Sequence, residues 1–287
     1  MSRRRLAAAL VVALAASPRA RTQAPTFSAR IESVRVDVLV TENGRPLRGL
    51  GAADFEVLDN DVLQQVNLVS FEEVPLNVIL ALDMSDSVAG ERLDQLREAG
   101  RAVLGGLTRD DQAGLVTFSN VVSLGSGLTK DTGAVETALN EAYGSGDTAL
   151  IDGAYAAMML GESDAGRALL MIFSDGLDTS SWLTADAALQ SARRSDIVAY
   201  SAAVTSAGET PFLRELSALT GGTVYKIDST KDLRATFVRI LEEFRHRYLV
   251  SYTPRGVSKE GWHRLTVRLK NRKATIKARP GYLAGGS

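Results

Sequence analysis

The middle of the chain alternates short, continuously apolar runs with stretches that repeat at helical spacing. The first run is 78–82, and runs of this kind are typical of strands buried on both faces of a parallel sheet. Helical spacing appears between the runs, as in 93–107, and a last helix is expected at 231–244. This alternation predicts an α/β fold with a doubly wound, mostly parallel sheet. The other apolar runs are 114–118, 168–173, 197–204 and 223–227, and the expected helix N-caps include Thr184 and Thr230.

The two flanks of this segment carry strand patterns. Valine occupies every second position from 34 to 40, and apolar and polar residues alternate in 265–269. Neither flank has enough strands for a two-sheet core of its own. We therefore predict that 25–74 and 245–287 pack together as a small β-sandwich module, with an α/β domain at 75–244 inserted between them.

The first 24 residues predict an export signal. Three arginines at 3–5 precede an apolar run at 6–16, and Ala24 stands at a plausible cleavage point. The run is too short to span a bilayer, and no later stretch is long and apolar enough to be a membrane helix. We expect 1–24 to be a signal peptide and the mature protein to be secreted to the periplasm, cell envelope or extracellular space, without a transmembrane segment. The alternative is an uncleaved N-terminal anchor.

Composition excludes several kinds of chemistry. The chain has no cysteine, which rules out disulfides, thiolate metal sites and a cysteine nucleophile. It has two histidines, His246 and His263, which excludes a His-rich zinc centre and nearly excludes a Ser-His-Asp triad. We expect both to be partly exposed side chains that ligate nothing. The net charge of −1 argues against a general polyanion binder, although not against a local basic patch. Lysine and arginine are frequent in 245–279, but we expect them to form the solvated face of strands, and we expect no nucleic-acid partner.

Polar residues follow the apolar runs at the places where a doubly wound sheet binds ligands, the carboxyl ends of its strands. Asp83, Ser85 and Ser87 follow the first run, and Asp175 follows the run at 168–173. Thr148 lies between them, in a segment that opens a helix. All these donors are hard oxygens, which suit Mg²⁺, Mn²⁺ or Ca²⁺ and suit Zn²⁺ or Cu²⁺ poorly. We predict a metal site with Mg²⁺ as the preferred divalent cation.

This set of residues resembles the metal-ion-dependent adhesion site (MIDAS) of the von Willebrand factor type A (VWA) domain. The family pattern is Asp-x-Ser-x-Ser, then a Thr, then an Asp in a Ser-Asp-Gly context, and all five positions match here. The resemblance covers about 75–244. The flanks also resemble a bacterial, acidobacterial-type subgroup through Asp54-Phe55-Glu56-Val57, the pair Tyr248 and Tyr252, and Arg279-Pro280-Gly281-Tyr282.

The resemblance implies a function in protein binding. The hydroxyls of Ser85, Ser87 and Thr148 would bind the cation directly, while Asp83 and Asp175 would act largely through bound waters. A position would stay open for an Asp or Glu carboxylate of a protein partner. The expected function is therefore a non-enzymatic, metal-dependent module of cell-adhesion type.

One departure from the family pattern leaves a question open. Asp86 stands between the two serines, where the family usually has a small residue, and Asp147 stands beside Thr148. Their carboxylates would either strengthen cation binding or repel an acidic ligand.

Other interpretations of these residues remain. A Mg²⁺-dependent hydrolase could use two carboxylates and a metal to activate water, although there is no Gly-x-Ser-x-Gly elbow, phosphate loop or convincing histidine base. A scaffold could hold a purely structural metal, or the residues could form an oxygen network without metal. We expect Asp152 and Asp178 to bond loops or cap helices, and Ser174 either to orient Asp175 or simply to end a strand.

Overall fold

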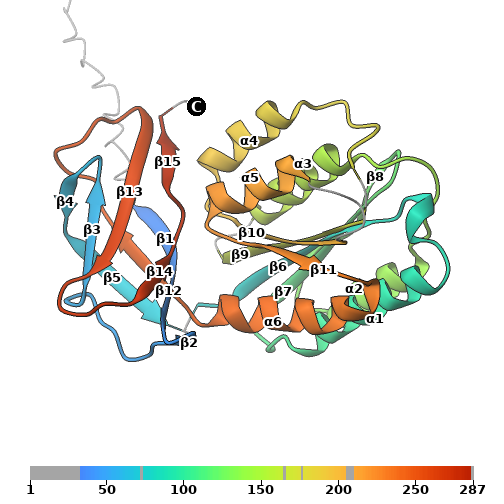
Figure 1. Ribbon diagram of the computed structural model, residues 1–287, viewed down its shortest axis with the longest axis horizontal. Helices are drawn as coiled ribbons and strands as arrows, with labels where there is room; N and C mark the ends of the chain where they lie inside the picture. The colour runs from blue at the N-terminus through green and yellow to red at the C-terminus, as the bar shows by residue number, and fades with distance from the viewer. Residues whose placement is uncertain (1–32, 72–73, 164–165, 176, 205–209, 286–287) are drawn as a thin grey trace, which may run out of the picture. The chain divides into compact units, whose positions relative to one another are not determined.

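The computed structural model describes residues 33–71, 74–163, 166–175, 177–204 and 210–285. The predicted signal peptide and the start of the first flank lie outside these ranges. The described residues form one sheet covered by helices and two antiparallel sheets made by the flanks (Figure 1). No helix in the described ranges combines the length and the apolar character needed to cross a membrane.

The central sheet is an α/β sheet of six strands in the order β11-β10-β9-β6-β7-β8. All neighbouring pairs run parallel except β7 and β8, which are antiparallel. The predicted doubly wound, mostly parallel sheet is therefore confirmed, and each predicted apolar run corresponds to a strand. The strands are β6 Leu76–Asp83, β7 Gln112–Phe118, β8 Val122–Thr129, β9 Arg167–Ser174, β10 Val198–Val204 and β11 Val224–Ile227.

Helices cover both faces of this sheet, which explains why its strands are apolar without interruption (Figure 1). Every residue of β6 and β9 is buried. One face packs against α1 Glu91–Gly105, α2 Thr132–Glu141 and α6 Leu233–Arg245. The other packs against α3 Leu150–Gly161, α4 Ala185–Arg194 and α5 Pro211–Thr220.

The two predicted N-caps have different outcomes. The Thr184 side chain accepts a hydrogen bond from Ala187 N at the start of α4, as expected. The prediction for Thr230 is wrong, because Thr230 is the first residue of a short 3-10 helix that precedes α6. Ser229 caps that turn by accepting a hydrogen bond from Lys231 N.

The flanks form two small antiparallel sheets that share an apolar core, which confirms a β-sandwich built from both ends of the chain. The first contains β1 Val34–Glu42, β2 Arg45–Pro46, β5 Val66–Phe71, β12 Arg247–Tyr252 and β14 Thr275–Lys277. The second contains β3 Phe55–Asp59, β4 Val62–Gln64, β13 Gly261–Leu269 and β15 Gly281–Ala284. The residue boundaries of the domains stay a prediction.

The expectation of a partly exposed His263 is wrong. The side chain is fully buried, and its Nδ1 lies 2.7 Å from Asp59 Oδ1. His263 shares a strand face with Leu265, because side chains alternate along β13, and that face is turned into the sandwich core. The alternation of apolar and polar residues in 265–269, extended back by two positions, already placed His263 on the apolar face of this strand.

Candidate metal-binding site

The site begins at the carboxyl end of β6, where Asp83 is completely buried. Its Oδ1 accepts a hydrogen bond of 2.9 Å from Ser85 N, and its Oδ2 accepts one of 2.8 Å from the Ser174 hydroxyl. Ser174 ends β9, the parallel neighbour of β6. Ser174 therefore ends a strand, as one of the two sequence interpretations held, and it also orients Asp83, which neither of them anticipated.

Hydroxyl groups connect this first loop to Asp175. Ser85 Oγ lies 3.0 Å from Ser87 Oγ, and the Ser87 hydroxyl donates a hydrogen bond of 2.5 Å to Asp175 Oδ1. The structure thus brings together Asp83, Ser85, Ser87 and Asp175. It does so because β6 and β9 are adjacent and parallel, so that their carboxyl ends meet at one edge of the sheet.

Thr148 belongs to a loop that contacts this cluster through its neighbours. Asp86 N donates to Gly146 O at 3.1 Å, and Gly146 N donates to Asp86 Oδ1 at 2.8 Å. Thr148 itself is buried, and its backbone N–H donates to the Thr179 hydroxyl at 2.9 Å. These bonds hold the loop of Thr148 against the loop of the two serines. A metal-ligand role for the Thr148 hydroxyl stays a prediction.

The same contacts give Asp86 a role that the sequence left open. Its carboxylate accepts the Gly146 N–H, so it ties two loops of the site together. Asp86 is exposed to solvent, which screens its charge toward an incoming ligand. The structure therefore favours a loop-fixing role for this aspartate.

Close packing between the two loops also requires a glycine. A Cβ atom on Gly144 would lie 2.1 Å from the carbonyl oxygen of Met84, a separation that no real side chain tolerates. Met84 is the residue between Asp83 and Ser85. The absence of a side chain at position 144 thus sets how closely the Thr148 loop approaches the first loop.

Asp152 and Asp178 have the structural roles that we expected. The two carboxylate oxygens of Asp152 accept hydrogen bonds from Trp182 N and Leu183 N, each at 2.9 Å. Asp178 Oδ1 accepts one of 3.2 Å from Ile151 N in the first turn of α3. Both residues fix the loop beside Thr148.

Burial dominates the electrostatics of the site. It raises the pKa of Asp83, and the charge of Asp175 adds to this rise, while hydrogen bonds from Ser85 and Ser174 oppose it. Both residues are buried, Asp83 completely and Asp175 almost so, and the repulsion between their carboxylates is unfavourable in a medium of low dielectric. A divalent cation between them would relieve this cost.

Arg92 contacts the candidate site and was not anticipated from the sequence. Its Nη1 donates to Asp175 Oδ2 and to Ser87 O, both at 3.0 Å. The signal in the sequence was its position: it falls in the first turn of the helix that follows the serine loop.

The donor set fits a hard cation held mainly by hydroxyl groups. The described residues contain no group of three or more His, Asp or Glu side chains arranged to hold a metal. The candidate site instead combines two buried carboxylates with the hydroxyls of Ser85, Ser87 and Thr148. Oxygen donors of this kind suit Mg²⁺, Mn²⁺ or Ca²⁺.

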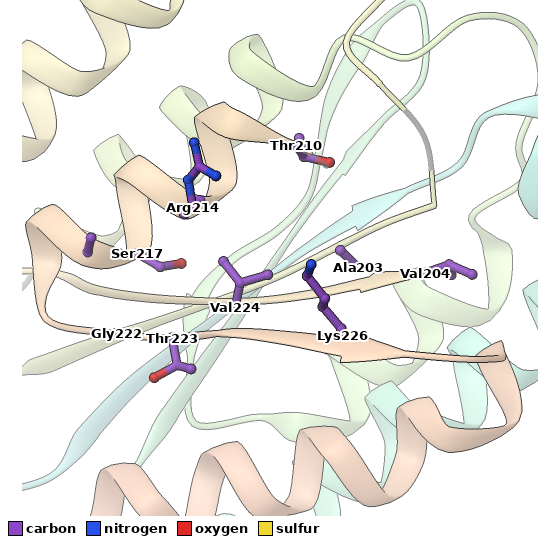
Figure 2. Close-up of a pocket in the computed structure, with 10 residues that line it drawn as sticks. Ala203, Val204, Thr210, Arg214, Ser217, Gly222, Thr223, Val224 and Lys226 are labelled. Carbon is purple, nitrogen blue, oxygen red and sulfur yellow. The ribbon is translucent and has the colours of Figure 1, made fainter. Parts of the chain in front are cut away.

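A pocket lies beside β11, the terminal strand of the central sheet, between α5 and strands β10 and β11 (Figure 2). Its volume is about 460 Å³, and Arg214 and Lys226 contribute the charged part of its lining. Residues 205–209, which join two of its lining residues, lie outside the described ranges. We assign no ligand to this pocket.

The fold and the site together define an α/β protein with a polar, oxygen-rich edge at the carboxyl ends of its strands. A sequence model of the von Willebrand factor type A domain matches residues 77–239, more than half of the chain. The chain therefore belongs to the VWA family.

Comparison with solved structures gives the same fold. A von Willebrand factor type A protein from Catenulispora acidiphila has a TM-score of 0.55 and 15% identity, with 85% of this chain and 76% of that chain covered. Proximal thread matrix protein 1 from the mussel byssus has a TM-score of 0.53 and 13% identity, with 63% and 49% covered. Another structure of the byssus protein, with a zinc-occupied MIDAS motif, has a TM-score of 0.55 and 12% identity, with 65% and 49% covered.

These likenesses concern the fold alone, because the identities are low. This chain spans about half the length of the byssus protein. The match to the Catenulispora acidiphila protein extends beyond the region of the family model, into the flanks. Among curated proteins, no sequence match was found.

Proposed function

We propose that this chain is a non-enzymatic, divalent-cation-dependent protein-binding module of cell-adhesion type. The observation that carries the proposal is the hydrogen-bonded arrangement of Asp83, Ser85, Ser87 and Asp175 at one edge of the sheet. Distant parts of the chain supply these side chains, yet their oxygens lie within a few ångströms of one another. The acidobacterial-type subgroup stays part of the same proposal.

The chain's own residues would hold the cation in a defined way. The hydroxyls of Ser85, Ser87 and Thr148 bind it directly, and Asp83 and Asp175 orient its bound waters. When bound, Mg²⁺, or Mn²⁺ or Ca²⁺ in its place, supplies an open position that an Asp or Glu carboxylate of the partner completes. The byssus protein, which has a similar fold, holds zinc in its MIDAS motif, and this supports the proposal that such a fold can bind a metal there.

Export of the protein belongs to the same proposal. The N-terminal segment 1–24 acts as a signal peptide, and the module works in the periplasm, the cell envelope or the extracellular space. These compartments contain divalent cations, so the site would be loaded where the protein meets its partner.

Calorimetric titration of Mg²⁺, Mn²⁺ and Ca²⁺ into the mature chain tests the metal site. We expect saturable binding that is lost in Asp83→Ala and strongly weakened in Ser87→Ala. Ser87 is exposed, so its variant should fold normally. Ser126→Ala is the matched control, because it removes a hydroxyl from β8 that bonds only locally to Gly127 O. Equal titrations for all four proteins would contradict the proposal.

A second experiment separates protein binding from the alternatives. Capture of partners by the immobilised chain should require Mg²⁺ and fail in EDTA or with Asp83→Ala. A cation that raises the melting temperature without affecting capture would indicate a structural metal. Mg²⁺-dependent turnover of phosphoesters or esters that Asp175→Ala abolishes would indicate a hydrolase.

A further inference from the structure

A pocket of about 480 Å³ lies beside the candidate metal site, and the proposed function does not use it. We call it the side pocket. It includes Met84, which lies between Asp83 and Ser85, and Ser145, which lies in the loop that leads to Thr148. The side pocket is therefore continuous with both loops of the site.

The lining mixes polar and apolar groups and contains a single charged residue. Val121 and Ala138 contribute apolar surface, and Glu141 is the only ionisable acid or base in the lining apart from Tyr143. Glu141 is the last residue of α2 and is exposed. Within the described ranges, no side-chain hydrogen bond or ion pair engages its carboxylate. The side pocket thus presents the negative charge of Glu141 within a lining that mixes polar and apolar groups.

Tyr143 adds an aromatic surface at the same place. Its side chain is 83% exposed, an unusual degree for a tyrosine in a folded protein. An exposed tyrosine that lines a pocket is typical of a binding surface, because tyrosine contributes much contact area at low entropic cost. Its ring also attracts cations.

We propose that the side pocket receives a lysine or arginine side chain from the same partner segment whose carboxylate reaches the cation. Lysine and arginine combine an apolar stem with a charged head, so the head can pair with the Glu141 carboxylate while the stem packs on the exposed ring of Tyr143. An acidic side chain would be repelled by Glu141, and a purely aliphatic one would leave that charge without a partner. The inference rests on the proposed function and adds to it the chemistry of the partner: a segment that carries both a carboxylate and a basic residue.

Selection from a displayed library of short random peptides with one fixed aspartate tests this inference. The library is retained on the mature chain in Mg²⁺ and released with EDTA. We expect the released peptides to be enriched in Lys or Arg at a constant spacing from the aspartate. A synthetic peptide of the enriched sequence should bind Glu141→Gln about fivefold more weakly than the unchanged chain, the upper range for an exposed ion pair. Tyr143→Ala should also weaken it.

The control is Glu215→Gln, which removes an exposed glutamate on α5, away from the pocket lining. It should bind the peptide like the unchanged chain. The side-pocket inference would be overturned if the EDTA-released peptides showed no preference for Lys or Arg, or if they bound Glu141→Gln as tightly as the unchanged chain. Either result would leave the proposed function standing. Absence of any EDTA-released peptides would contradict the proposed function, and the inference with it.

Discussion

Arg92 Nη1 lies 3.0 Å from Asp175 Oδ2, so a guanidinium of the chain itself contacts a carboxylate that is predicted to serve the cation. The Asp175 side chain is 2% exposed, whereas that of Arg92 is 53% exposed. Arg92 can therefore move into solvent at little cost, while Asp175 is fixed in place. Because both positive charges interact with the same carboxylate, Arg92 and a bound cation oppose each other.

Replacing Arg92 by glutamine should tighten cation binding. Glutamine removes the positive charge and keeps a polar side chain, so Mg²⁺ no longer competes with a guanidinium for Asp175. We expect the Kd for Mg²⁺ to fall about fivefold, or roughly 1 kcal/mol, because the ion pair is half exposed. Calorimetric titration measures this directly. Arg101→Gln should leave the Kd for Mg²⁺ unchanged, because Arg101 lies on the same helix but bonds to Asn140. A weaker affinity of Arg92→Gln for Mg²⁺ would refute competition between Arg92 and the cation for Asp175.

The buried carboxylate of Asp83 should give the cation-free protein a distinctive pH dependence. Burial raises the pKa of Asp83 above its ordinary value of 3.8, so ionising this group costs folding free energy. The contribution of the Asp83 carboxyl group to the free energy of unfolding is largest below pH 3.8. It decreases as the pH rises through the raised pKa and stays low above it. Asp83→Asn cannot ionise and should lack this decrease.

Melting temperatures measured between acidic and neutral pH, with and without Mg²⁺, test this expectation. At neutral pH without a cation, Asp83→Asn should melt at a higher temperature than the unchanged chain, and Mg²⁺ should stabilise only the unchanged chain. The pKa values of Asp111 and Glu243 are lowered, so these two groups make the protein more stable as the pH rises, opposite to Asp83. Both proteins contain these groups, so the difference between their melting temperatures isolates the effect of Asp83. Parallel pH profiles would show that Asp83 is not the cause.

The sequence was sufficient to predict the central sheet because burial on both faces leaves a clear mark. β6 and β9 are apolar almost throughout and are buried at every position. β8 escaped prediction because it is an edge strand, VSLGSGLT, in which serine and glycine interrupt the apolar residues. An edge strand with one partner needs no continuous apolar run.

The candidate site was predictable in part for a related reason. Asp83 and Asp175 follow buried strands, so their convergence depends only on strand order and direction. The bond from Arg92 to Asp175 and the bond from Gly146 to Asp86 depend on the paths of loops and on the start of α1. Sequence spacing does not determine these paths, so their partners became visible only in three dimensions.

Gly144 offers a test of how closely the two loops must approach. In Gly144→Ala the new methyl group would meet the Met84 carbonyl at 2.1 Å, so the Thr148 loop has to move away. Crowding of this kind costs about 1–3 kcal/mol, which corresponds to roughly 5- to 150-fold in Mg²⁺ affinity if the close approach is needed for binding. Gly127→Ala is the matched control, because a Cβ at that position meets no atom within 4 Å. Unchanged Mg²⁺ affinity in Gly144→Ala would show that Thr148 is not a ligand of the cation.

The junction between the central sheet and the flanking sandwich depends on a buried ion pair. Asp37 on β1 accepts hydrogen bonds from Arg167 Nε at 2.8 Å and from Arg167 Nη2 at 2.5 Å. Both side chains are almost inaccessible, with exposures of 7% and 1%. Asp37→Ala would leave a buried guanidinium without its counter-charge and should lower the free energy of unfolding by about 3–5 kcal/mol.

An exposed pair on the same strand provides the comparison. Glu42, also on β1, contacts Arg272 at 2.6 Å, and both side chains are substantially exposed. Glu42→Ala should lower the free energy of unfolding far less than Asp37→Ala, because solvent screens the pair. Urea denaturation of the two variants measures both values. The double variant Asp37→Ala/Arg167→Met should be more stable than Asp37→Ala alone, since it removes the isolated charge; a further loss of stability would mean that Arg167 acts mainly through its bonds to the carbonyl oxygens of Phe244 and Arg247.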